Sequence, residues 1–314
     1  MLTILECVQA ACQELGLTAP ATVYGAADLQ TIQLGALMNA DLRELRQMKE
    51  GGWTDLQKTF VITVGPTLVT TGTYSDGGTV ITGIPTTAAI TPATAFQVSG
   101  SYINQAARVV SVDSGTQVTI DIPTTGAATG DTLTFTQDSY TMPSDFDHFI
   151  NDTWWDVTNH WILFGPDTPQ RYQQEVAGIV TTGPRRHFHQ VGRTTGNNYR
   201  IWPPIGTVEN NFSIEWQYVS RYAVQAANGT YKERFTADDD LPTLEDNIFI
   251  MGAKWRFFQI KQLDYAPLQQ EYLDYVNRRI GQDGGATVLD LAKGSVDSYL
   301  ISPAQVPDGN WAGS

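Results

Sequence analysis

Pairs of neighbouring acidic residues are the first candidates for chemistry in this chain. Asp145 with Asp147, and Glu271 with Asp274, could supply the two carboxyl groups that glycoside hydrolysis requires about 5–9 Å apart, on either side of the scissile bond. Acids also gather at the first turn of helices, where the helix dipole stabilises negative charge. Because Ser144 is a good N-cap residue, we interpret the first pair as part of a helix start. Hydrolysis of cell-wall glycan is the alternative.

The basic residues of the chain concentrate in one region. His187 and His189 could ligate a metal, but neighbouring arginines would repel a cation, so the sequence predicts neither a metal site nor a cofactor. The arginines of this basic loop are Arg185, Arg186, Arg193 and Arg200. Such a loop could bind an acidic partner or DNA phosphates, or it could simply be solvated.

The remaining polar motifs do not indicate an enzyme. Asp238-Asp239-Asp240 lacks the spacing of a calcium loop and is interpreted as a solvated lead-in to a helix. The sequence contains no glycine-rich phosphate loop and no Ser/His/Asp elbow. We therefore predict a protein without catalytic residues.

The composition indicates a folded, acidic protein that buries surface in an assembly. Of the 314 residues, 41% are hydrophobic and 11% aromatic, which rules out global disorder. Only 17% are charged, and 33 acids against 19 Lys and Arg give a net charge of −14. That charge argues against tight wrapping of nucleic acid. The scarcity of charge and the many aromatic residues favour an oligomer.

Helical periodicity covers both ends of the chain. Apolar residues at three- and four-residue spacing predict helices over residues 1–16, 26–50, 144–157, 168–177, 242–265 and 267–280. The helix over 242–265 is apolar on most of its circumference, which predicts burial between partners. Its main stripe consists of Leu244, Ile248, Met251, Trp255 and Phe258.

The middle of the chain has the composition of an all-β domain. Residues 59–137 are rich in Thr, Gly, Val and Ile, and short β-type runs alternate with turn signals, which is typical of a small sandwich or barrel. Further on, strict alternation predicts a strand over residues 211–219, and residues 199–202 are expected to form a neighbouring strand.

The two ends of the chain bear on partners and compartment. Residues 295–314 carry more large apolar groups than a disordered tail would, so we expect them to dock on a partner. These groups are Val296, Tyr299, Leu300, Ile301 and Trp311. The N-terminus lacks the features of a secretory signal, Cys7 and Cys12 are too far apart on a helix for a disulfide, and the sequence contains no run long enough to span a membrane. We expect a soluble protein made in a reducing cytoplasm.

Several motifs in the second half resemble a known family. They are Met142-Pro143-Ser144-Asp145-Phe146-Asp147, Trp154-Trp155-Asp156, Phe164-Gly165-Pro166, Leu241-Pro242, Trp255-Arg256-Phe257 and Leu263-Asp264-Tyr265-Ala266. Together with the N-terminal helices they resemble head-to-tail adaptor proteins of short-tailed bacteriophages. The β-rich segment departs from the simplest members of that family, as if it were inserted.

The resemblance implies an α+β fold with a helical-bundle core, a small antiparallel sheet and an inserted β-sandwich or barrel. The core would comprise residues 1–58 and 138–294, the inserted domain 59–137, and an extended C-terminal arm 295–314. It further implies a virion protein that forms a ring of about twelve copies under the portal, extends the DNA channel and carries the tail.

The expected partners are further copies of the chain, the portal protein, tail nozzle or tail fibre proteins, and passing double-stranded DNA that is not tightly bound; no membrane is expected. An acidic wall would let DNA pass without sticking. A receptor- or glycan-binding tail component is an alternative from another class, resting on the β-rich segment and its aromatics.

Overall fold

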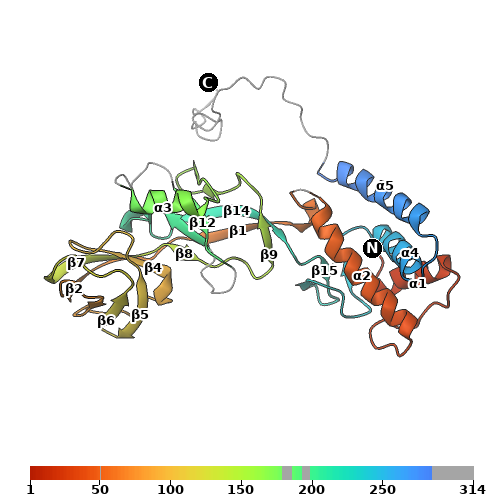
Figure 1. Ribbon diagram of the computed structural model, residues 1–314, viewed down its shortest axis with the longest axis horizontal. Helices are drawn as coiled ribbons and strands as arrows, with labels where there is room; N and C mark the ends of the chain where they lie inside the picture. Colours follow the sequence, from red (N-terminus) through yellow and green to blue (C-terminus); the bar gives the residue numbers. More distant parts are fainter. Residues whose placement is uncertain (50, 179–185, 193–198, 285–314) are drawn as a thin grey trace, which may run out of the picture. The chain divides into compact units, whose positions relative to one another are not determined.

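The computed structural model describes residues 1–49, 51–178, 186–192 and 199–284. Within these ranges the chain has five α-helices and several small antiparallel sheets, which confirms the α+β class. None of the described sheets closes into a barrel. The chain divides into two compact units (Figure 1): a first unit of Met1–Lys58, Ser144–Ile150 and Gln217–Ser295, and a second unit of Thr59–Pro143, Asn151–Trp216 and Val296–Ser314.

The first unit is mainly helical. Its elements are α1 Ile4–Glu14, α2 Leu29–Met48, the 3-10 turn η1 Thr54–Leu56, α4 Asp246–Ile260 and α5 Ala266–Gln282. A capping box formed by Thr3 and Glu6 starts α1, and Asp28 caps α2 by accepting a hydrogen bond from the Thr31 amide. The helices predicted over 1–16, 26–50, 242–265 and 267–280 are thus confirmed; the first three are shorter than predicted, and α5 extends beyond its predicted bounds at both ends.

Helix α4 lies at the centre of the first unit, in contact with α1, α2 and α5 (Figure 1). In its predicted stripe, Ile248 and Trp255 are buried and Met251 and Phe258 half-buried; Leu244, just before the helix, is also buried. Its apolar faces are therefore covered by helices of the same chain. Helix α4 is apolar on most sides because it lies in the core of its own unit. Its stripe residues are buried or half-buried, so their exposure does not support the predicted ring contact, which stays a prediction.

A charged network crosses this helical core. Asp41 on α2 is fully buried and accepts hydrogen bonds from Arg256 Nε at 3.0 Å and the Tyr272 hydroxyl at 2.9 Å. Arg256 also binds Glu44 at 2.6 Å. Burial raises the pKa of Asp41 to about 6, against the opposing effects of Arg256 and Tyr272. The network joins α2, α4 and α5.

The predicted helix over 144–157 is wrong, because this segment forms strands. Residues Phe146–Phe149 form β9, which pairs with β14 Ser213–Ser220. Asp145 does not cap a helix: its carboxylate accepts hydrogen bonds from the Tyr218 hydroxyl at 2.8 Å, Ser220 Oγ at 2.7 Å and Lys58 Nζ at 2.7 Å. These tertiary partners and the pairing with β14 override the helical spacing of the apolar residues.

Strand β14 confirms the predicted alternation, with Ile214, Trp216 and Tyr218 buried. It belongs to a sheet of order β1-β14-β10-β11, in which β9 also pairs with β14. The strands β1, β10 and β11 are Gln57–Thr63, Trp155–Asp156 and Trp161–Ile162. The strands β10 and β11 belong to the second unit, whereas β9 belongs to the first. A separate small sheet of the first unit has the order β16-β15-β17, with strands Tyr231–Lys232, Val224–Gln225 and Leu241–Pro242.

The β-rich part of the second unit consists of two three-stranded antiparallel sheets. One has the order β2-β7-β4, with strands Thr67–Tyr74, Ala128–Gln137 and Phe96–Ser99. The other has the order β3-β6-β5, with strands Val80–Ile81, Gln117–Ile120 and Val109–Ser114, and the 3-10 turn η2 Ala93–Ala95 lies between β3 and β4 in the sequence. Side chains from both sheets, including Ile81, Val118 and Phe135, form one buried cluster.

The rest of the second unit is built on aromatic side chains. Its elements are β8 Ser139–Tyr140, α3 Pro169–Ala177, β12 His187–Gln190, β13 Tyr199–Trp202 and the 3-10 turn η3 Thr207–Glu209. Helix α3 confirms the prediction for 168–177. Strand β13 pairs with β12 and β8, so the expectation that it neighbours the 211–219 strand is wrong.

The two units differ from the predicted domains in two segments, residues 138–143 and 151–216, which were predicted to belong to the core. The boundary after Lys58 coincides with the predicted start of the β domain, but residues 151–216 group with residues 59–143. Hydrogen bonds link the two stretches: the Ile201 amide donates to the Asp138 carbonyl at 2.8 Å, and Gln105 Nε2 to the Val176 carbonyl at 3.0 Å. Among the described residues, no helix is both long and apolar enough to cross a bilayer.

Candidate functional site

The end of α5 is taken as the candidate site for the predicted adaptor role, because it is the last described part of the chain before residues 285–294 and the predicted arm 295–314. Asp283 and Gly284 are the last described residues before residues 285–314. Asp283 Oδ2 binds Lys49 Nζ at 2.5 Å and accepts a hydrogen bond from the Thr54 amide at 3.0 Å. We call Lys49, Thr54, Asp283 and their neighbours in the adjoining cavity the arm root.

The ion pair at the arm root is well shielded. The side chains of Lys49 and Asp283 are each only 15% exposed. Burial alone would raise the pKa of Asp283, but the contacts with Lys49 and Thr54 outweigh it and hold this pKa below its usual value. A shielded ion pair with a backbone partner contributes more than the surface average of about 0–1 kcal/mol. The last turn of α5 is therefore fastened to the end of α2.

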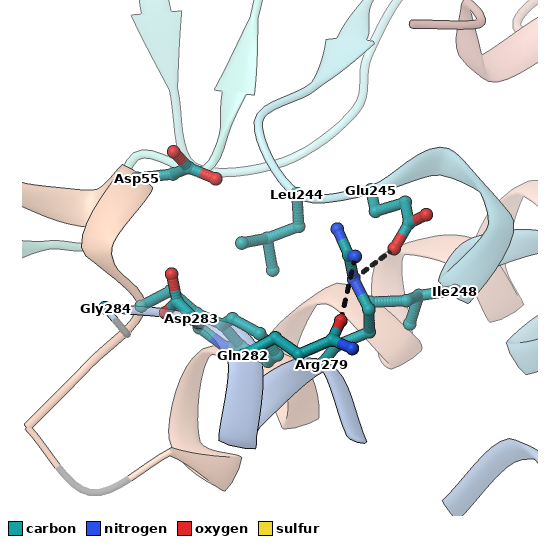
Figure 2. A pocket seen from close by; sticks show the side chains of 9 residues that line it. Asp55, Leu244, Glu245, Ile248, Arg279, Gln282, Asp283 and Gly284 are labelled. Atoms are coloured by element: carbon teal, nitrogen blue, oxygen red, sulfur yellow. Dashed lines mark hydrogen bonds and ion pairs between the residues drawn. The ribbon is translucent and has the colours of Figure 1, made fainter. Parts of the chain in front are cut away.

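A cavity of about 210 Å³ adjoins this ion pair (Figure 2). Its lining comprises Trp53, Asp55, Leu244, Glu245, Ile248, Arg279, Gln282, Asp283 and Gly284. Figure 2 shows Leu244 between Asp55 and the Glu245–Arg279 pair. Arg279 Nε lies 2.5 Å from Glu245 Oε2, and the Tyr275 hydroxyl donates to Glu245 Oε1 at 2.9 Å.

Two of the three carboxylates that line the cavity, Glu245 and Asp283, are each paired with a basic side chain. Glu245 pairs with Arg279, and Asp283 with Lys49. A general acid or base must be available to a substrate proton, whereas these carboxylates serve as acceptors for fixed partners. The arrangement is suited to anchoring the chain at the start of the arm.

The arm residues themselves fall outside the described part of the chain. Val296, Tyr299, Leu300, Ile301 and Trp311 belong to residues 285–314, and their docking on the portal stays a prediction. Sequence reasoning missed Lys49 and Asp283 as anchors. They stand 234 positions apart, and no local pattern indicates their pairing.

The basic loop is only partly described. Arg185 and Arg193 lie outside the described residues. Arg186 binds Glu209 at 2.5 Å and donates to the Pro203 carbonyl at 3.2 Å, while Arg200 lies on β13 opposite His189 in register. The charge of Arg186 is therefore offset within its own unit.

The paired acids do not form a carboxyl dyad in a cleft. Asp145 is buried in its network with Lys58, Tyr218 and Ser220, whereas Asp147 lies 2.8 Å from His148 Nδ1. Glu271 and Asp274 lie on the exposed side of α5. Neither pair lines the arm-root cavity.

The Asp238–Asp240 segment is structural, so its interpretation as a solvated lead-in is wrong. Asp238 Oδ1 accepts hydrogen bonds from the amides of Val23 at 2.9 Å and Tyr24 at 2.8 Å. Asp240 is fully buried and lies 2.6 Å from Lys232 Nζ. Two of the three carboxylates thus fasten loops of the first unit.

Comparisons with known proteins add no relative: no family model matches the chain, and neither does any curated protein.

Proposed function

We propose that the chain is a ring-forming head-to-tail adaptor of a short-tailed bacteriophage. In this role it docks under the portal, extends the DNA channel and provides the platform on which tail nozzle or tail fibre proteins assemble. The ring contains about twelve copies and belongs to the virion, at the junction of capsid and tail.

The observation that carries the proposal is the role of the residues behind the family resemblance, which serve the fold. Trp154 is fully buried, stacking on Phe188 at 3.9 Å and on Trp216 at 4.6 Å between ring centroids. At Gly165 an added Cβ would lie 2.5 Å from the Phe188 carbonyl oxygen. Arg256 closes the network with Asp41 and Glu44. The motif residues Trp154, Gly165 and Arg256 thus pack and stabilise the fold, which supports a structural role for the protein.

Self-association is supported by apolar side chains left open on the first unit. Leu29 is 82% exposed and Ile32 48% exposed, three residues apart on α2, and Ala36 follows four residues later and is also exposed. This spacing places all three on one helix face. Protein interfaces take up such groups, whereas the buried stripe of α4 is not available to a neighbour.

The net charge and the end of α5 bear on two further parts of the proposed role, the DNA channel and the docking arm. A net charge of −14 suits a wall that repels passing DNA. The arm root holds the end of α5, which precedes residues 285–294 and the predicted arm 295–314 in the sequence.

The test is to image the purified full chain, alone and mixed with the portal of the same phage, by mass photometry and negative-stain microscopy. We expect rings alone, or ring-on-ring complexes once the portal is added. A chain that stays monomeric and never associates with the portal refutes the proposal.

A matched variant separates the arm from the ring. Deletion of residues 296–314 should leave ring formation intact and abolish or weaken portal docking. Unchanged docking of the truncated chain would remove the arm from the proposal while keeping the ring.

A further inference from the structure

A cluster of two carboxylates and one histidine lies in the second unit, apart from the arm root. Asp167 precedes α3, Glu175 lies in its last turns and His187 begins β12. His187 Nδ1 lies 3.2 Å from Asp167 Oδ2 and 3.6 Å from Glu175 Oε1. One donor atom from each of the three residues falls within 4.8 Å of the other two.

Backbone hydrogen bonds build this cluster and fix its geometry. The Asp167 amide donates to the Phe188 carbonyl at 2.9 Å, and the Phe188 amide donates to the Phe164 carbonyl at 2.9 Å. Thr168 caps α3, and Pro169 occupies its first turn, so the helix starts directly after Asp167. The three side chains are thus held by a helix start, a helix end and a strand.

The cluster contains buried oxygens that accept no hydrogen bond. The Asp167 side chain is only 4% exposed, and its Oδ2 atom has no hydrogen bond of good geometry; its neighbour is His187 Nδ1, 3.2 Å away. Glu175 Oε2 is likewise buried without a donor. A buried carboxylate oxygen without a donor costs free energy, and burial raises the pKa of Asp167, with the neighbouring Glu175 adding to the effect.

Among the described residues, the lysine or arginine side chain that pairs with these acids is the guanidinium of Arg171. Its Nε atom lies 3.4 Å from Asp167 Oδ1 and 3.1 Å from Glu175 Oε1. The Arg171 side chain is 57% exposed, so it can turn into solvent without loss of core packing. Arg186, which the sequence analysis expected to repel a metal here, is bound to Glu209.

We propose that Asp167, Glu175 and His187 bind a divalent transition-metal ion, with Zn²⁺ the best match, and that Arg171 yields its place to the ion. A tetrahedral ion about 2.0–2.2 Å from each nitrogen or oxygen ligand holds the ligands about 3.3–3.6 Å apart. The distances from His187 Nδ1 to the two carboxylates, 3.2 and 3.6 Å, match that spacing. One imidazole with two carboxylates is a ligand set that zinc accepts.

The ion would act as a structural clip. It would join the end of α3 to the start of β12 and neutralise two acids whose buried oxygens lack donors. Metal binding to a site formed only in the folded chain adds its binding free energy to stability.

The test uses the tag-free full chain, stripped of metal with a chelator and titrated with Zn²⁺ by calorimetry. We expect saturable binding of one ion per chain and a rise in the melting temperature. Co²⁺ in place of Zn²⁺ should give the visible absorption of a tetrahedral nitrogen and oxygen site.

Variants locate the site. Loss of a residue that only hydrogen-bonds to a metal ligand weakens metal binding about 10- to 100-fold. Glu175→Gln and His187→Ala each remove a ligand, so each should weaken Zn²⁺ binding by more than that. Arg171→Gln should tighten it, because the competing cation is removed. His148→Ala is the matched control: His148 lies beside Asp147 but outside the cluster, and the variant should bind like the parent chain.

Two results would overturn the proposal. One is the absence of saturable binding by a chain whose circular dichroism shows it to be folded. The other is equal binding by the parent chain, Glu175→Gln and His187→Ala, which would show an adventitious ion only.

Discussion

Replacing Gly252 with alanine should destabilise the helical unit, although alanine is the better helix former. Gly252 lies in α4 against the buried carboxylate of Asp41. A Cβ at this position would lie 2.2 Å from Asp41 Oδ2, 2.5 Å from Cγ and 2.8 Å from Oδ1. Contacts below 3.0 Å force a shift, and here the group that must move is held by Arg256 and Tyr272.

The expected magnitude follows from three contributions. Overpacking costs about 1–3 kcal/mol. Weakening the hydrogen bonds to the Asp41 carboxylate costs up to about 1.5–3 kcal/mol. The helix propensity of alanine offsets about 0.5–1 kcal/mol. The net loss in the free energy of unfolding is about 2–4 kcal/mol, or roughly 4–16 °C in melting temperature at about 2–4 °C per kcal/mol.

The assay is urea unfolding followed by circular dichroism, with Gly281→Ala as the matched control. Gly281 lies near the end of α5, where an added Cβ would meet nothing within 4 Å, so its substitution should be neutral or stabilising by up to about 1 kcal/mol. The double variant Asp41→Ala/Gly252→Ala should lose less than the sum of the single variants, since the smaller side chain makes room. A Gly252→Ala chain as stable as Gly281→Ala, or strict additivity, would refute the reasoning.

The remaining predictions concern pH, the arm root and the ring. Because the folded pKa of Asp41, about 6, lies above its ordinary value of 3.8, its contribution to stability is present below about pH 4 and is lost as the pH rises through 6. The parent chain should therefore lose about 2 kcal/mol relative to Asp41→Asn between pH 4 and 7 in denaturant titrations, and parallel curves for the two chains would contradict this. Asp283→Ala removes the partner of Lys49 and Thr54 and should cost about 1–3 kcal/mol at pH 7 by the same assay, whereas unchanged stability would mean that the arm root is not a fastening. The pKa of Asp283 is lowered, so the difference between parent and variant should shrink as the pH falls below about 4. If rings form, Leu29→Glu/Ile32→Glu should dissociate them in mass photometry while Val69→Glu, at a 57% exposed position of the β-rich segment, should not; rings that survive the double change would place the contact elsewhere.

Most helices followed from the sequence because their signals are local. The apolar residues of these helices recur three or four positions apart, and the caps that the structure adds, such as the Thr3–Glu6 box, are equally local. The alternation of Ile214, Trp216 and Tyr218 marked β14 for the same reason. The segment from Phe146 misled the prediction, because its apolar spacing fits a helix while its partners on β14 lie some 70 positions away.

The sites depended on contacts that no local pattern records. The sequence by itself determined a folded acidic protein with helical ends and a β-rich middle, since composition and periodicity act over short stretches. Only the tertiary structure brought Lys49 to Asp283, Asp41 to Arg256 and Tyr272, and Asp167 and Glu175 to His187. A buried charge must find its partner wherever the packing of other elements places one, and that packing is set by the whole chain.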